Sequence, residues 1–237
     1  MGWKVKRDCE RGRAEKKMSN LFPMFLKLEG KRCLVVGAGN VGEPKIGGLI
    51  DTGARVHVIA LRASEIVHGW AQAGKISLEL RDFAADDLDG TFLAVVATAS
   101  RALNESIYRA AQRRGVLCNV VDDPEYCDFY YPAVVRRGDL QIAISTNGRS
   151  PSLSQKLRQQ LERQFGPGYA QWVAELGETR KLAMASDLEP ERKKELLHSL
   201  ASREAVKAAI AEAARHQLAK DELAKEELAK DERRVTV

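Results

Sequence analysis

The chain has 237 residues, 44% of them hydrophobic and 30% charged, and a formal net charge of +5. This length accommodates one large domain and a smaller one, and the composition is typical of a globular protein. No apolar stretch approaches the roughly 20 residues that a transmembrane helix needs, and the charged N-terminus lacks the apolar core of a secretion signal. We therefore expect a cytoplasmic protein that does not bind membranes.

The positive charge is concentrated at the N-terminus. Residues 1–17 hold seven Lys or Arg against three Asp or Glu, so the remainder is almost neutral. A nearly neutral body argues against nucleic acid as a partner. We expect residues 1–19 to be a basic, disordered leader, or the native protein to start at Met18 or Met24; we favour the later start.

Strand and helix patterns alternate from Arg32 onward. Short runs rich in Val, Ile and Leu predict five strands: Arg32–Val36, Arg55–Ala60, Ile76–Leu80, Phe92–Ala97 and Leu117–Val121. Helical patterns separate them at residues 41–52, 64–73 and 101–114. Continuous apolar strands that alternate with helices predict an α/β fold with a parallel sheet covered on both faces.

The first predicted strand leads directly into the sequence Gly37-Ala38-Gly39-Asn40-Val41-Gly42, and a helical pattern follows. In a GxGxxG motif the first glycine makes the turn, the second admits a pyrophosphate and the third lets the helix pack closely. The helix N-terminus adds N–H groups and partial positive charge. These features predict a dinucleotide site, and the alternative is a tight turn that binds nothing.

Other candidate cofactor contacts follow from the carboxyl ends of the strands, where doubly wound sheets bind their ligands. These candidates are Ala60, Leu61, Ala97 and Thr98. The second strand contains no Asp or Glu for the ribose hydroxyls, and Arg62 alone does not decide between NAD and NADP.

Asp122 follows the fifth predicted strand at the same edge. A partly desolvated carboxylate beside a nicotinamide is suited to accept a proton while hydride leaves the substrate. The alternative is that Asp122 only caps a turn with Asp123-Pro124.

The pattern changes after Asp122. Phe129–Arg136 and Leu140–Ser145 predict a hairpin, and Ser150-Pro151 predicts a helix start. Further helices are expected at residues 170–185, 190–200 and 203–218, followed by a charged repeat that we expect to be solvated. The cysteines and histidines show no metal-ligand spacing, so we expect no metal site, and Cys33 and Cys118 fall in predicted buried strands.

Four ordered motifs together resemble one known family. They are Leu34–Gly42, Asn119–Pro124, Cys127–Ala133 and Ile142–Pro151. Their sequences closely resemble the precorrin-2 dehydrogenase / sirohydrochlorin ferrochelatase family, the siroheme-synthase module that makes siroheme from precorrin-2. The resemblance covers about Phe22 to Phe165.

The resemblance implies NAD-dependent oxidation of precorrin-2 to sirohydrochlorin by a homodimer, with Asp122 as the catalytic carboxylate. Some members of the family also insert ferrous iron, without a dedicated metal cage. A dehydrogenase without chelatase activity and a nucleotide-sensing module without turnover remain alternatives. Because the tetrapyrrole carries many carboxylates, we expect cations and hydroxyls to bind it. The candidate substrate contacts are Arg136, Thr146, Arg149 and Ser150.

The resemblance also completes the expected domain organisation. It comprises the leader (1–19), a Rossmann-type NAD-binding domain (20–128), a dimerisation segment of hairpin and helix (129–165), a helical region (166–217) and the charged tail (218–237). Two positions depart from the family pattern: Pro44 replaces a long, often basic residue, and Asn147 replaces a common glycine. Proline is tolerated in a first helical turn, and asparagine tolerates left-handed backbone, so we expect neither to disrupt the fold.

Overall fold

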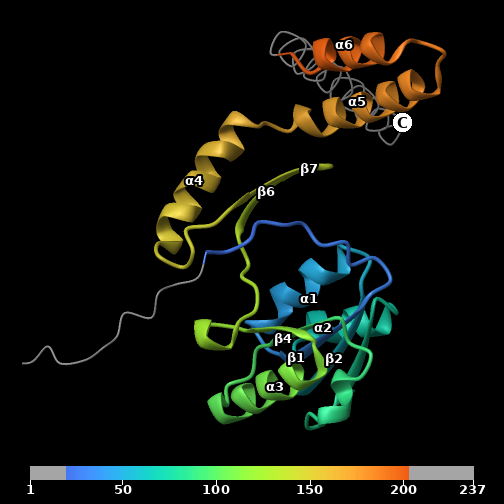
Figure 1. Ribbon diagram of the computed structural model, residues 1–237. Helices are drawn as coiled ribbons and strands as arrows, with labels where there is room; N and C mark the ends of the chain where they lie inside the picture. Colours follow the sequence, from blue (N-terminus) through green and yellow to red (C-terminus); the bar gives the residue numbers. More distant parts are fainter. Residues whose placement is uncertain (1–19, 203–237) are drawn as a thin grey trace, which may run out of the picture. The chain divides into compact units, whose positions relative to one another are not determined.

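The computed structural model describes residues 20–202, which divide into two compact units between Tyr131 and Pro132. The first unit holds a five-stranded sheet with helices on its faces, and the second holds a two-stranded hairpin and three helices (Figure 1). The leader 1–19, the predicted helix 203–218 and the charged repeat lie outside the described residues.

The sheet of the first unit is entirely parallel. Its strands are β1 (Arg32–Ala38), β2 (Arg55–Ala63), β3 (Ile76–Leu80), β4 (Leu93–Val96) and β5 (Leu117–Val120). The helices between them are α1 (Gly42–Ile50), α2 (Glu65–Gln72) and α3 (Arg101–Arg114). The strand order β3-β2-β1-β4-β5 is that of a Rossmann fold, which confirms the predicted fold class.

Alternation along β1 sends its side chains to two separate cores. Cys33 and Val35 pack with Ile46 of α1 on one face, whereas Leu34 packs on the other face with Ile107 of α3. Both faces of the sheet are therefore covered at β1. The packing of β1 against α1 holds the carboxyl end of this strand close to the N-terminus of the helix.

The strand β2 is longer than its apolar pattern predicts. It continues to Ala63, where Ala38 pairs with Ala63 after a shift in register. Ala60 is therefore a buried position inside the strand, and the expectation that β2 ends at Ala60 is wrong. The extra pairing comes from the neighbouring strand β1, a tertiary effect that local sequence does not reveal.

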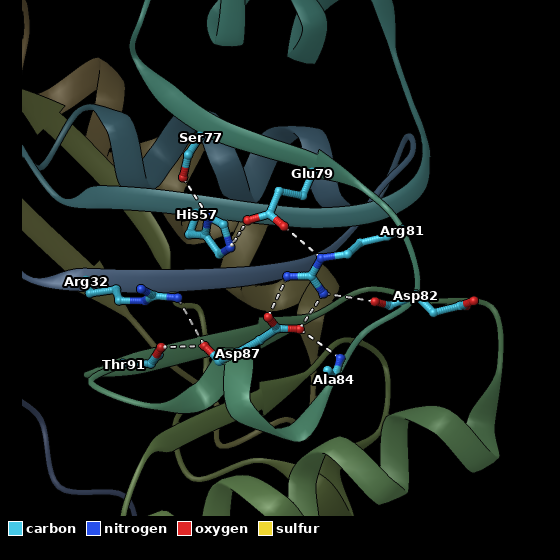
Figure 2. Close-up of polar contacts among 9 residues, drawn as sticks. All are labelled: Arg32, His57, Ser77, Glu79, Arg81, Asp82, Ala84, Asp87 and Thr91. Atoms are coloured by element: carbon cyan, nitrogen blue, oxygen red, sulfur yellow. Dashed lines mark hydrogen bonds and ion pairs between the residues drawn. The ribbon is translucent and has the colours of Figure 1, made fainter.

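The connection from β3 to β4 contains only a short 3₁₀ helix, η1 (Ala85–Leu88). A bidentate ion pair organises it: Arg81 donates to both carboxylate oxygens of Asp87, at 2.9 and 2.6 Å. Asp87 also accepts the Ala84 backbone N–H at 2.8 Å (Figure 2). Nearby His57 contacts Glu79, with 3.2 Å between Nε2 and Oε1. Polar side chains thus occupy the face of β2 and β3 beside this connection.

The second unit begins with the antiparallel hairpin β6 (Ala133–Arg137) and β7 (Leu140–Ile144). It continues with α4 (Pro151–Gln164), α5 (Gly168–Ala185) and α6 (Pro190–Leu200). The hairpin strand starts at Ala133, later than the predicted Phe129. Ser150 caps α4 as predicted, because its Oγ accepts the Leu153 N–H.

No helix within residues 20–202 combines the length and the apolar character that crossing a membrane requires.

Candidate functional site

The glycine loop between β1 and α1 is closely packed at two of its three glycines. Gly37 has φ +101°, and a Cβ there would lie 2.4 Å from the Ala97 carbonyl oxygen. A Cβ at Gly42 would lie 2.1 Å from the Gly37 carbonyl oxygen. At Gly39 a Cβ would meet no atom within 4 Å. The loop is therefore tight toward the sheet and open at Gly39, the position where the motif admits a pyrophosphate.

The N-terminus of α1 follows this opening directly. Its N-cap residue, Val41, makes no side-chain cap hydrogen bond, and the Glu43 N–H donates to the Gly39 carbonyl at 2.9 Å. The earliest N–H groups of a helix have no intrahelical acceptor, and anions bind there favourably. Asn40 and Val41 are exposed beside them. The residues present therefore fit the pyrophosphate of a dinucleotide.

A hydrogen-bonded turn after β4 holds Thr98 in place. Thr98 Oγ1 donates to Asn104 Oδ1 at 2.5 Å, and Asn104 Nδ2 donates back to the Thr98 carbonyl at 3.1 Å. Asn104 is buried in α3, so its amide fixes the loop from inside the protein. Sequence reasoning selected Ala97 and Thr98 but missed Asn104, because a polar residue on a helix gives no sign of its burial.

The candidate residues on β2 differ in their exposure. Ala60 is buried, whereas Leu61 is 69% exposed and the next residue, Arg62, is also exposed. Among these three residues, only Leu61 and Arg62 offer side-chain surface to a ligand.

Asp122 lies just beyond β5 in a left-handed backbone conformation, with φ +62°. Its neighbour Asp123 donates its N–H to the Val120 carbonyl at 3.3 Å, and the 3₁₀ helix η2 (Pro124–Tyr126) follows. The side chain of Asp122 is exposed, whereas the sequence led us to expect partial desolvation. The carboxylate therefore projects from the carboxyl edge of the sheet, and a bound ligand would have to supply the expected desolvation.

Lys45 of α1 lies near enough to Asp122 for their charges to interact. The Lys45 Nζ is 3.9 Å from the centroid of the Tyr131 ring, a cation–π contact. Burial lowers the pKa of Lys45 below its usual value, and the negative charge of Asp122 partly opposes that shift. The sequence analysis considered only the neighbouring Pro44, which is accommodated in the first turn of α1. The sequence analysis missed the next residue, Lys45, whose charge interacts with Asp122.

Two of the four candidate substrate residues are hydrogen-bonded to each other in the second unit. Thr146 Oγ1 accepts the Ser150 N–H at 3.1 Å and lies 3.1 Å from the Ser150 carbonyl, to which it donates. Arg149 lies in the same turn, Arg136 lies on β6, and both are exposed. Asn147 adopts φ +54°, which confirms that left-handed backbone is needed there.

The buried cysteines belong to the core. Cys33 and Cys118 are fully buried in β1 and β5, as predicted, and burial raises their pKa values to about 11 and about 12. Such thiols are protonated and unreactive at neutral pH. Within residues 20–202, no group of three or more His, Cys, Asp or Glu is placed to hold a metal ion.

Two family models match the chain. Residues 24–133 match a putative NAD(P)-binding family, and residues 137–164 match the central region of sirohaem biosynthesis proteins. The first match confirms the predicted dinucleotide-binding domain. The second lies in the hairpin and α4, the region that the sequence analysis also assigned to this family.

Curated relatives are siroheme synthases. That of Methylococcus capsulatus is 43% identical over 141 residues, and siroheme synthase 2 of Yersinia enterocolitica is 42% identical over 141 residues. Each match covers 60% of this chain, and the chain spans only 30% of the length of each relative.

A solved structure covers more of the chain. SirC, a precorrin-2 dehydrogenase, superposes with a TM-score of 0.71 and 27% identity, over 83% of this chain and 98% of SirC. Together these matches confirm the resemblance to the precorrin-2 dehydrogenase / sirohydrochlorin ferrochelatase family that the four motifs indicated.

Proposed function

Because the chain resembles the siroheme-synthase module in both sequence and fold, we propose that it oxidises precorrin-2 to sirohydrochlorin with NAD. The observation that carries this proposal is the similarity to SirC over 98% of that structure, since it includes both units of the described chain. The open position at Gly39 and the uncapped N-terminus of α1 support dinucleotide binding. NAD, when bound, supplies the hydride acceptor.

Asp122 is the proposed proton acceptor. Its carboxylate projects from the carboxyl edge of the sheet, the edge at which ligands of this fold bind. The Lys45 ammonium interacts electrostatically with this carboxylate, and the Tyr131 ring contacts that ammonium. When the substrate excludes water, a carboxylate held this way takes the proton that leaves with the hydride.

We further propose that the second unit binds the substrate carboxylates and forms a homodimer. Arg136 and Arg149 are exposed and carry fixed positive charge, while the Thr146 and Ser150 pair shapes the turn before α4. Guanidinium groups bind carboxylates with two parallel hydrogen bonds, which suits a substrate with many acid groups.

The test is to mix precorrin-2 and NAD with the protein and follow the tetrapyrrole spectrum. Asp122→Asn should lower kcat about 10²–10⁴-fold, the usual contribution of a general base, while NAD affinity stays the same. Asp123→Asn is the matched control, because it removes a neighbouring carboxylate whose only described ion pair is with exposed Arg101. If the wild type forms no sirohydrochlorin, the function is wrong; if Asp122→Asn is as fast as wild type, the role of Asp122 is wrong.

Insertion of ferrous iron into sirohydrochlorin is the second candidate, with the iron as substrate. The exposure of Asp122 favours it, because an accessible carboxylate can accept the pyrrole protons that metal insertion releases. Adding ferrous iron anaerobically to sirohydrochlorin and the protein distinguishes this activity from a dehydrogenase alone. NAD binding without turnover of either substrate would instead identify a nucleotide-sensing module.

A further inference from the structure

The end of β2 lacks the acid that dinucleotide folds commonly use. In a Rossmann domain, an Asp or Glu about 20 residues after the glycine motif hydrogen-bonds the ribose 2′-hydroxyl of NAD. Here β2 runs from Arg55 to Ala63 and contains no carboxylate. Arg62, exposed near its end, is the type of residue that would instead attract a 2′-phosphate.

A carboxylate reaches this place from a different element. Glu43 lies in the first turn of α1, and its Oε2 accepts a hydrogen bond of 2.5 Å from the Ser64 hydroxyl. Ser64 is the residue directly after β2, and its own N–H donates to the Ala38 carbonyl at 3.2 Å. The Glu43 side chain is thus held at the end of β2, on the helix whose N-terminus faces the pyrophosphate position.

The Glu43 carboxylate retains capacity to accept a further hydrogen bond. The hydroxyl of Ser64 occupies one oxygen, and within residues 20–202 no other partner of Glu43 is recorded. Ser64 is itself fixed, because its Oγ accepts the Val67 N–H at 3.3 Å as the N-cap of α2. A carboxylate has two oxygens and several acceptor sites, so it can bind a ribose hydroxyl while it stays bonded to Ser64.

We infer that Glu43 replaces the missing acid of β2 and selects NAD against NADP. Its carboxylate accepts the 2′-hydroxyl of the adenosine ribose and repels a 2′-phosphate at the same position. Ser64 is the positioning residue. Arg62 opposes this selection, because its positive charge attracts a 2′-phosphate. This assignment rests on the proposed use of a nicotinamide dinucleotide and names the residue that decides which one binds.

The experiment measures binding alone, with ADP-ribose and 2′-phospho-ADP-ribose as probes that cannot be reduced. Isothermal titration calorimetry on the full chain should show that the wild type binds ADP-ribose at least about tenfold more tightly than its 2′-phosphate. Glu43→Gln should weaken ADP-ribose about tenfold or more, as expected for a hydrogen bond to a charged group, and remove most of the discrimination. Ser64→Ala should give a smaller loss of discrimination, because the carboxylate remains but is less well held.

Asp51→Asn is the matched control, since Asp51 is an exposed acid at the opposite end of α1. It makes the same change in charge and should leave both affinities unchanged. Thermal unfolding and circular dichroism establish that each variant is folded. If Glu43→Gln does not fold, Glu43→Asp serves instead, because it retracts the carboxylate by one methylene and should also reduce discrimination.

The assignment is overturned if the wild type binds both probes equally or binds 2′-phospho-ADP-ribose more tightly. It is also overturned if the Glu43 variant discriminates between the two probes as strongly as the wild type does. If neither probe binds to folded wild type, the dinucleotide site and the assignment are both wrong. If Glu43-dependent selection is present but precorrin-2 is not oxidised, the proposed function is wrong while the inference holds.

Discussion

A methyl group added at Gly42 would lie 2.1 Å from the carbonyl oxygen of Gly37, whereas one added at Gly39 would meet no atom within 4 Å. The two glycines belong to one motif but have different physical roles. Gly42 permits α1 to approach the backbone of β1, so it is required by the fold. Gly39 leaves open space at the helix N-terminus, so it is required only by a ligand.

Alanine should therefore affect stability at Gly42 and ligand affinity at Gly39. Gly42→Ala should reduce the free energy of unfolding by about 2–3 kcal/mol, because backbone must move to relieve the overlap. Gly39→Ala should leave the unfolding temperature nearly unchanged but weaken ADP-ribose binding at least tenfold. Thermal unfolding and calorimetry measure the two effects. An unaltered unfolding temperature for Gly42→Ala, or an unaltered affinity for Gly39→Ala, would contradict this division of roles.

At the scale of elements, the connection from β3 to β4 depends on Asp87. This buried carboxylate receives two hydrogen bonds from Arg81 and one from the Ala84 N–H. Its bonds to Arg81 hold its pKa below the ordinary value for an aspartate. Because the folded-state pKa is depressed, the stabilisation is complete above the ordinary pKa near 4 and is lost as the pH falls through the folded-state value.

Asp87→Asn should consequently lower the unfolding temperature at pH 7 by about 3–5 °C. It should also flatten the fall in unfolding temperature between pH 5 and pH 3, since the variant has no carboxylate to protonate there. Circular dichroism melts across this pH range test both effects. Asp86→Asn is the control, because that carboxylate is almost fully exposed. If the unfolding temperatures of wild type and Asp87→Asn fall in parallel between pH 5 and pH 3, the ion pair does not have this role.

The sequence predicted those elements whose signal is local. Apolar runs and glycines located the five strands, and Ser150-Pro151 located the start of α4. The extension of β2 to Ala63 was missed because it depends on pairing with Ala38. The hydrogen bond between Glu43 and Ser64 and the charge interaction of Lys45 with Asp122 were also missed. They join residues that are distant in sequence, and only the folded sheet brings them together.

For the whole molecule, the two units differ in how well they bury their own apolar residues. The first has a core on each face of its sheet, whereas the buried residues of positions 132–202 are only Val135, Ser154 and Ala183. A two-stranded hairpin is marginally stable by itself. A cavity of about 540 Å³ is lined by residues of β7 and α4, among them Ile144, Leu157 and Leu161. This apolar surface supports the proposal that the second unit is completed by a second copy of the chain.

The homodimer should therefore stabilise the second unit increasingly as the protein concentration rises. Sedimentation velocity should show a dimer, and hydrogen exchange of the β6, β7 and α4 amides should become slower as the dimer forms. Amides of β1 should exchange equally slowly at all concentrations, because their core lies within one chain. Leu157→Asp should weaken the dimer and speed exchange in the hairpin, whereas Gln159→Asp, an exposed position on the same helix, should change neither. A wild-type chain that stays monomeric at every concentration while its hairpin amides remain protected would show that the second unit needs no partner.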